Sequence, residues 1–431
     1  MDIVSARNLA LWLSWPSVLG EFAPAPLAGD SASCLPAAPW PEGDPRVTDV
    51  RQAFRESVRS CMAGHETVAV SFSGGLDSFA VLIEAARIAA QDGRRVVIAV
   101  ADLTDDAGGS NVPIARRLVA AAGLDDLELY VSSTGDMPRQ RPEWRPDAPA
   151  LDALPLANRY LAEQAADRGA TVMLGGNGAD EILGAVRYLT GAHLKTAQWT
   201  ACRSYWADAS GARREAFVSE ALALACRALP RRHRAFVYLA LEWPELCTRA
   251  EAPDVIAEPL RGHVDQWSAT WITELLAYHA AHHRTWAQAA AWDAVFPLTL
   301  LAGPGPIALK HPFQTPEFIG AVQQLPIARR YDPSLPHAYW RQKAQVIALI
   351  PDHARSVLPT AKQTFRAALT NQATEKSSAR YLIEHDIISP SAWRSEQDPL
   401  LVRRVNALET WAHGALERGY AIAEDTAALT A

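Results

Sequence analysis

The chain has 431 residues, of which 49% are hydrophobic and 21% are charged, a composition typical of a globular protein with a substantial core. Its formal net charge of −7 gives no sign of a basic surface, so we expect no nucleic-acid partner. The five cysteines lie far apart without a Cys-x-x-Cys pair, which disfavours a zinc site and favours free thiols in the cytoplasm. The apolar stretch at residues 8–20 contains Trp and Pro, which argues against a signal peptide, and no apolar run is long enough to span a membrane.

The predicted elements begin after a Pro- and Ala-rich stretch, so residues 1–46 are expected to form an N-terminal segment and linker. Helices and strands then alternate: helix 47–63, strand 67–72, helix 77–91, strand 95–101, helix 111–122, strand 127–131, helix 155–168 and strand 170–174. The strands are nearly continuous apolar runs, and helices separate them, which predicts an α/β fold with a doubly wound parallel sheet. We therefore expect residues 47–190 to form an α/β core.

Strand signals stop at about residue 185, and Ala, Leu and Trp recur beyond it at helical spacing. Residues 191–431 are expected to form a mostly helical part that completes the site. Most of its tryptophans are expected in the core, with a peptide groove as the alternative. Three histidines, His279, His282 and His283, have a spacing that would let two of them share a helical face and bind a metal. No carboxylate motif accompanies them, so a solvated or capping role is favoured.

The first chemical motif follows the first strand of the predicted core and reads Ser73-Gly74-Gly75-Leu76-Asp77-Ser78. Glycines at the carboxyl end of a parallel strand let backbone N–H groups approach an anion at a helix N-terminus. The motif is not a P-loop, because it lacks the Lys-Ser/Thr pair. Asp77 would repel a polyphosphate unless a cation lies between them, and Mg²⁺ is suited to that position. The alternative is that Asp77 only caps a helix and the glycines only form a turn.

The second motif, "LGGNGADEILGA" at residues 174–185, follows another predicted strand. Its glycines permit close backbone approach, and Asp180 places a second carboxylate at the carboxyl edge of the same sheet. Asp77 and Asp180 are therefore expected to converge on one metal–phosphate cluster. For Glu181, and to a lesser extent Asp180, the alternative is a purely structural role as a helix cap.

These motifs carry a family resemblance. Residues 73–78 resemble the Ser-Gly-Gly-x-Asp-Ser loop of ATP pyrophosphatases, and residues 174–185 are similar to the Gly-Glu-Gly-Ala-Asp-Glu segment of the asparagine synthetase family. That family includes β-lactam synthetases and lasso-peptide macrolactam synthetases, and the resemblance covers about residues 50 to 375. It implies an adenine nucleotide pyrophosphatase-type fold, ATP and Mg²⁺ as cofactors, and adenylation of a carboxylate that an amine then converts to an amide.

The resemblance also assigns residues to roles. It implies that Asp77 and Asp180 hold Mg²⁺, and that ATP and its pyrophosphate are bound by Ser71, Ser73, Gly74, Gly75, Asp77, Ser78, Val100, Gly176, Lys343 and Lys362. The family carries a late lysine after a Leu-Pro pair, and "VLPTAKQTF" presents Lys362 in that position. Lys362, Asp77 and Asp180 are thus the predicted catalytic residues. Lys343 in "WRQKAQ" is the other candidate for the catalytic lysine, but it aligns better with a conformational or structural lysine. The alternative for either residue is a solvated surface charge, which is the usual role of a lone lysine.

Three features depart from the family pattern. Residue 2 is Asp instead of a nucleophilic Cys, and only some 50 residues precede the core, so we expect no glutaminase domain. Asn177 stands where the synthetases carry an acid/base Glu, and an amide cannot take a proton near neutral pH, so Asn177, like Glu181, is expected only to position the substrate. Thr360 replaces the usual Arg before the late lysine.

The expected function is therefore an ATP-dependent amide ligase that uses no glutamine. Residues 311–365 resemble the C-terminal half of lasso-peptide macrolactam synthetases, which implies a precursor peptide as substrate and a leader peptidase as partner. An intramolecular amine has a high effective concentration, which suits such a site. The alternatives are a small-molecule amide synthetase acting on a free carboxylic acid and, as a different class, a nucleotide-binding scaffold without catalysis.

Overall fold

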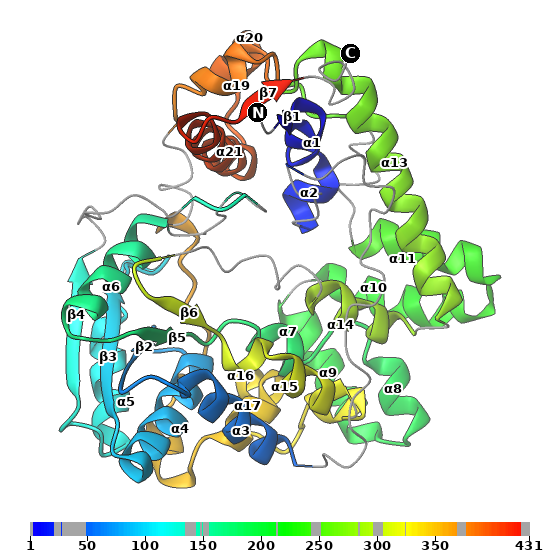
Figure 1. The fold of residues 1–431 in the computed structure, drawn as a ribbon. Coiled ribbons are helices and arrows are strands. Elements are labelled where there is room, and N and C mark those ends of the chain that lie inside the picture. Colours follow the sequence, from blue (N-terminus) through cyan, green and yellow to red (C-terminus); the bar gives the residue numbers. More distant parts are fainter. Residues whose placement is uncertain are drawn as a thin grey trace.

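The computed structural model describes residues 3–20, 27, 49–133, 144–146, 149, 155–212, 214–242, 251–282, 285–295, 305–323, 325–368 and 376–423. One part of the molecule is built on a parallel β-sheet, and a second part consists of helices together with a small pair of strands (Figure 1). Across the ranges given above, no helix has both the length and the hydropathy needed to cross a membrane.

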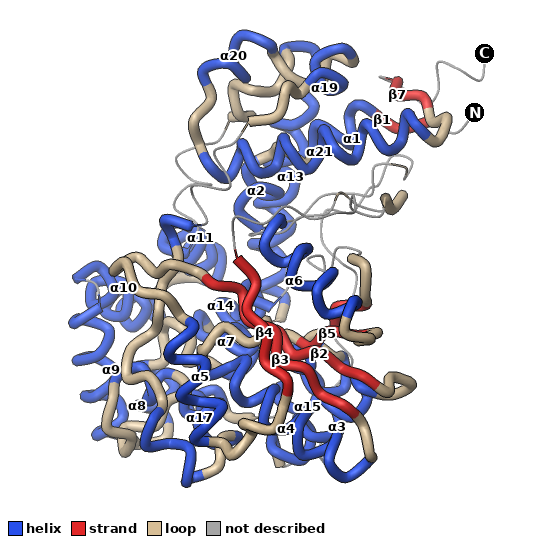
Figure 2. The backbone as a smooth tube through the Cα atoms, turned by 90° about the vertical axis from the view of Figure 1, so that its left-hand side faces the viewer, coloured by secondary structure: helices blue, strands red, loops and turns tan. Residues whose placement is uncertain are grey.

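The central sheet has five parallel strands in the order β4-β3-β2-β5-β6 (Figure 1), and Figure 2 shows β4, β3, β2 and β5 from another side. They are β2 (Thr67–Ser71), β3 (Arg95–Asp102), β4 (Glu128–Ser133), β5 (Val172–Leu174) and β6 (Ala308–Lys310). The first four strands and the α/β fold class confirm the prediction. The expectation that strands stop near residue 185 is wrong, because β6 pairs with β5. A strand of three residues is too short to show the period of two that identifies strands in a sequence.

Helices cover both faces of the sheet, and the alternation of side chains along the strands determines which helix packs where. Val68 and Val70 of β2 lie on the face covered by α3 (Val50–Met62), α4 (Leu76–Asp92) and α5 (Val112–Ala121). Ala69 points to the opposite face, where α6 (Pro155–Asp167) packs. Each aliphatic side chain buried here contributes about 1.5–3 kcal/mol to stability.

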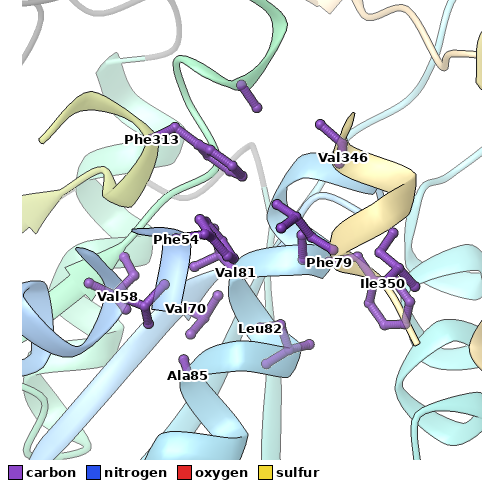
Figure 3. Packing of buried hydrophobic residues seen from close by; sticks show 14 of the residues in the cluster. Phe54, Val58, Val70, Phe79, Val81, Leu82, Ala85, Phe313, Val346 and Ile350 are labelled. Carbon is purple, nitrogen blue, oxygen red and sulfur yellow. The ribbon is translucent and has the colours of Figure 1, made fainter. Parts of the chain in front are cut away.

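Segments far along the chain complete this core. The ring of Phe54 in α3 stacks on that of Phe313, with centroids 4.7 Å apart (Figure 3). Val346 and Ile350 join the same cluster from α17 (Ala344–Leu349) and the residue after it. Nearby elements are η3 (Pro312–Gln314), α15 (Pro316–Gln323), η4 (Ile327–Arg330), α16 (Ala338–Gln342) and η5 (Asp352–Val357). The α/β core therefore continues past residue 190. The later segment that packs on it also brings Lys343 and Lys362 to the sheet.

The N-terminal residues pack with the C-terminal helices (Figure 1). Strand β1 (Ile3–Ser5) pairs in parallel with β7 (Ala421–Ala423), while α1 (Ala6–Leu11) and α2 (Trp15–Gly20) contact α13 (Glu258–Ala281) and α21 (Pro399–Glu417). Leu9, Trp12 and Leu13 are buried in this cluster. Residues 8–18 of the apolar stretch are thus part of a core, and residues 21–26 and 28–46 of the predicted linker lie outside the described residues.

The remaining helices are α7 (Ala179–Leu183), α8 (Thr190–Lys195), α9 (Trp199–Ala212), α10 (Arg214–Ala225), η1 (Cys226–Ala228), α11 (Arg231–Glu242), α14 (Trp286–Val295), α19 (Arg380–Glu384) and α20 (Pro390–Ser395). Trp267, Trp271 and Trp292 are buried, as expected of core tryptophans, whereas Trp199 is 68% exposed. Cys61, Cys202 and Cys226 are free thiols, and the other two cysteines lie outside the described residues.

The three histidines of the "HAAHH" stretch do not share one environment. His279 is buried, with its Nε2 atom 2.9 Å from Oδ1 of Asp293. His282 is exposed at the end of α13, its ring 4.2 Å from that of Tyr278 between centroids, and His283 lies outside the described residues. Within the described part of the chain, no group of three or more His, Cys, Asp or Glu side chains is arranged to hold a metal.

Candidate active site

The candidate site lies where the strand order reverses. From β2 the chain moves outward to β3 and β4, whereas β5 and β6 lie on the other side of β2. In open α/β sheets, ligands bind at the carboxyl ends of the strands at this switch point. The loops that leave β2 and β5 here lead to Asp77 in the first turn of α4 and Asp180 in the first turn of α7. The sequence predicted this convergence.

The loop after β2 is shaped to expose backbone at the start of α4. Gly74 has φ +81°, a left-handed conformation that favours glycine. Gly75 is the N-cap and supplies no side chain to cover the helix end. The Ser78 hydroxyl donates to the carbonyl of Gly75 at 3.2 Å and accepts from the N–H of Ser73 at 3.3 Å. The loop is thereby closed on itself in front of the positive end of a 17-residue helix, which is suited to an anion.

Asn111, which the sequence reasoning did not single out, fixes this loop to β3. Its side chain is fully buried, and its Nδ2 donates to the carbonyls of Ser73 and Ala101, both at 3.1 Å. Its Oδ1 accepts from the N–H of Leu103 at 2.8 Å. The available signal was a polar residue at the start of the predicted helix 111–122, at the carboxyl end of a buried strand.

The glycine-rich loop after β5 packs directly on the loop after β2. A Cβ added to Gly176 would lie 2.6 Å from the backbone nitrogen of Ser78 and 3.0 Å from the carbonyl carbon of Asp77. Gly178 has φ +92°, and a Cβ there would lie 2.7 Å from Cγ of Gln314. The absence of a side chain at Gly176 therefore lets the loop that leads to Asp180 pack directly on the start of α4, which carries Asp77.

We expect the substitution Gly176→Ala to reduce activity by more than tenfold and to cost about 1–3 kcal/mol of stability, because backbone atoms must move to admit the methyl group. Steady-state kinetics and denaturant unfolding measure the two effects. The matched control is Gly262→Ala in α13, where a Cβ meets nothing within 4 Å and where alanine should stabilise the helix by about 0.5–1 kcal/mol. Equal effects of the two substitutions would contradict the close packing of the loops.

Two lysines meet the two carboxylates. Nζ of Lys343 lies 2.7 Å from Oδ1 and 2.6 Å from Oδ2 of Asp77, and it also contacts Oδ1 of Asp180. Nζ of Lys362 lies 2.8 Å from Oδ2 of Asp180. The Lys343 side chain is 3% exposed and the Lys362 side chain 57% exposed. Lys343, the competitor in the sequence reasoning, thus occupies the centre of the cluster, and Lys362 lies at its solvent side.

Backbone contacts explain why Lys343 is held so firmly. It lies between α16 and α17, and its N–H donates to the carbonyls of Tyr339 and Trp340 at 3.2 and 3.0 Å. The carbonyl of the preceding Gln342 accepts from the N–H of Ala185, just after α7, at 2.8 Å. The lysine is therefore placed by the same packing that places Asp180.

The surroundings shift the pKa values of the acidic groups in different directions. Burial raises the pKa of Asp77, and the charge of Lys343 opposes this shift. Burial also acts on Asp180, but the ammonium groups of Lys343 and Lys362 outweigh it and hold the pKa of Asp180 below its ordinary value. For Glu181, burial and then the charge of Asp180 raise the pKa. The pKa of Lys362 is raised because the attraction of Asp180 exceeds the effect of burial.

The other predicted residues are placed as follows. Ser71 is the last residue of β2, and Val100 is buried in the core, so any contact of Val100 with a nucleotide has to be made through its backbone. Asn177 is exposed in the loop between β5 and α7, and Glu181 is half-buried, with its carbonyl accepting from Nη1 of Arg330 at 3.1 Å. The roles of these residues toward ATP or another substrate stay predictions.

Comparisons with known proteins identify the family of the chain. The family model for asparagine synthase matches residues 49–303, which is more than half of the chain. Over 147 residues the chain is 30% identical to "Asparagine synthetase [glutamine-hydrolyzing] 1" of Bacillus subtilis (strain 168). That alignment covers 33% of this chain and 22% of the Bacillus protein. The chain therefore belongs to the asparagine synthase family.

Proposed function

We propose that the protein is an ATP-dependent carbon–nitrogen ligase that adenylates a carboxylate, releases pyrophosphate and joins the acyl group to an amine. The observation that carries this proposal is the convergence of Asp77 and Asp180 on one ammonium group, beside the glycine loop at the start of α4. A loop of this kind suits pyrophosphate as a leaving group, because it combines backbone N–H donors with carboxylates that need a bound cation.

The charges of the cluster indicate that a further cation is required. Two carboxylates and two ammonium groups sum to zero, which leaves nothing to neutralise a triphosphate. The oxygens of Asp77 and Asp180 contact the same Nζ atom, so the two carboxylates are close enough to share one ion. A pair of carboxylates with phosphate oxygens is a typical Mg²⁺ ligand set, so these residues fit Mg²⁺. When bound there, Mg²⁺ would polarise the phosphates and neutralise their charge.

In the first half-reaction, a carboxylate oxygen of the substrate attacks the α-phosphorus of ATP. The bond from this phosphorus to the oxygen bridging to the β-phosphorus breaks, and pyrophosphate leaves with the electron pair. The N–H groups at the start of α4 bind the phosphates, while Lys343 keeps Asp77 and Asp180 together. Lys362 presents its ammonium group at the solvent side, where it stabilises charge that develops on the α-phosphate oxygens.

In the second half-reaction, the amine nitrogen attacks the acyl carbon and AMP leaves with the electrons of the broken carbon–oxygen bond. The amine must lose a proton, and the amide of Asn177 cannot accept it. We therefore propose that the amine enters in its neutral form, and that the one proton it still releases as the amide forms passes to the phosphate of the departing AMP. An α-amino group has a pKa of about 8, so a useful fraction is neutral at cellular pH, whereas a lysine side chain with a pKa of about 10.4 is almost fully charged.

The lower pKa of an α-amino group favours the N-terminal amine of a peptide as the attacking group. We therefore propose that the enzyme forms a macrolactam on a lasso-type precursor peptide and uses no glutamine. The resemblance of residues 311–365 to macrolactam synthetases supports it. So does the high effective concentration of an amine on the same molecule as the activated carboxylate, which can reach about 10⁵ M or more. A leader peptidase would then supply the free N-terminus. The alternative is the same chemistry on a small carboxylic acid and a separate amine.

One experiment separates these proposals. The purified full-length protein is incubated with ATP, Mg²⁺ and either the precursor peptide encoded beside its gene, freed of its leader, or a panel of small acids and amines. We expect AMP, pyrophosphate and a peptide that has lost one water, and none of these from Asp77→Asn. AMP with a small acid but a peptide that stays linear would overturn the macrolactam proposal. No AMP with any carboxylate would overturn the ligase proposal.

A further inference from the structure

Lys362 lies on a segment that we call the strap, residues 359–368, which ends in a helical turn at residues 366–368. The strap follows η5 and begins at Pro359, whose carbonyl accepts from Nε1 of Trp340 at 2.8 Å. Residues 362–365 are neither helix nor strand. The Lys362 side chain is long and largely exposed, so its ammonium group is kept beside Asp180 only if the backbone that carries it is held in place.

A second loop lies against the strap. The β3 loop, residues 103–111, follows the carboxyl end of β3 and is braced internally by Asp105. Oδ1 of Asp105 accepts from the N–H groups of Ala107 at 3.0 Å and Gly109 at 2.7 Å. The N–H of Asp105 donates to the carbonyl of Gly109 at 2.8 Å. Asn111 ties the base of the same loop to Ser73, as described above, so the loop is a rigid extension of the phosphate-binding region.

The tip of the β3 loop holds the strap immediately after Lys362. Oδ2 of Asp105 accepts from Nε2 of Gln363 at 3.0 Å. The N–H of Asp106 donates to the carbonyl of Thr364 at 2.8 Å. Oδ1 of Asp106 accepts from the N–H of Ala367 at 3.0 Å. These three bonds join two segments that are far apart in the sequence, and hydrogen bonds to both aspartates hold their pKa values below the ordinary range, so both carboxylates are ionised at neutral pH.

We propose that Asp106, supported by Asp105, is a positioning residue for Lys362. The contacts form a continuous path from Ser73 of the phosphate loop through Asn111, the β3 loop, the strap and Lys362 to Asp180. The β3 loop thus sets the position of the Lys362 ammonium relative to the loop that binds pyrophosphate. A displacement of about 1 Å at a reacting centre can cost about 10² in rate, so this alignment matters for turnover. The inference rests on the proposed adenylation function.

Asp106 is the residue to change, because its carboxylate contacts the strap whereas Oδ1 of Asp105 braces its own loop. We expect Asp106→Ala to lower kcat for AMP formation about 10- to 100-fold, with KM for ATP changed less than about threefold. Asp106→Asn should retain most of the activity, because its side-chain carbonyl can still accept from Ala367. The matched control is Asp126→Ala. It removes an exposed aspartate from the loop before β4, which lies at the amino ends of the strands, away from the β3 loop at their carboxyl ends.

A double-mutant cycle shows whether Asp106 acts through Lys362. In a Lys362→Met background, Asp106→Ala should have almost no further effect on kcat, whereas a general structural role would lower kcat by the same factor in both backgrounds. That second result would overturn the proposal.

Amide hydrogen exchange gives a readout that does not need turnover. We expect Asp106→Ala to speed exchange in residues 360–368 and to leave the strands β2 and β3 unchanged, while Asp106→Asn behaves like the original chain. Unaltered exchange in the strap would overturn the positioning role. If the exchange result holds but no carboxylate supports AMP formation, the proposed function fails and the structural coupling stands.

Discussion

Replacing Lys343 by methionine is expected to lower AMP formation by about 10³-fold and to destabilise the fold by about 3 kcal/mol. The side chain is almost fully buried, and its ammonium group holds the carboxylates of Asp77 and Asp180 together. Removing it leaves Asp77 without its counter-ion and facing Asp180, which stays paired with Lys362. A largely buried carboxylate that loses its partner costs more stability than the intact pair contributes. Denaturant unfolding and an assay for AMP measure the two effects.

A second substitution separates stability from catalysis. Adding Asp77→Asn to Lys343→Met removes the charge that lost its counter-ion, so the double variant should regain most of the lost stability. The double variant should remain inactive, because the asparagine at position 77 lacks the negative charge that binds the cation. A Lys343→Met protein with full stability would contradict the role of Lys343 as the central counter-ion. Full activity in either variant would contradict the assigned site.

Replacing Lys362 by methionine is expected to lower kcat about 10²- to 10³-fold while changing the melting temperature little. The pair that Lys362 forms with Asp180 is largely exposed, and exposed ion pairs contribute about 0–1 kcal/mol to stability. The charge matters during the reaction, when negative charge develops beside it. KM for ATP should change less than kcat, because the phosphates are also bound by the loop before α4.

The control for this prediction is Lys195→Met, which removes an exposed lysine at the end of α8. It should leave both kcat and stability unchanged. If Lys362→Met lowered the melting temperature strongly and kcat only slightly, Lys362 would be a structural residue and the catalytic cation would have to be Lys343.

The phosphate-binding half of the site could be predicted because its signals are local. Glycines, a serine and an aspartate between a buried strand and a helix have few structural solutions, and parallel strands bring their carboxyl ends to one edge. That reasoning placed Asp77 and Asp180 together. The same rules located four strands of the sheet, since each is long or apolar enough to stand out from the helices around it.

The central position of Lys343 could not be predicted in this way. The lysine lies between two short helices, and its place depends on how the segment that contains Phe313 and Val346 packs on α3 and α4. No residue pattern in the sequence predicts how that segment packs. The contacts of Asp106 could not be predicted for the same reason. Its partners Thr364 and Ala367 are far away in the sequence and come near it only because the strap lies against the β3 loop.

Transfer of ¹⁸O shows whether a carboxylate attacks the α-phosphorus of ATP. The carboxylate substrate that supports turnover is labelled with ¹⁸O in its carboxyl group, and the nucleotide and phosphate products are analysed by mass spectrometry. If the carboxylate attacks the α-phosphorus, one ¹⁸O atom appears in AMP and none in pyrophosphate. Label in inorganic phosphate together with ADP would show attack at the γ-phosphorus and would contradict the assignment of the Asp77 loop.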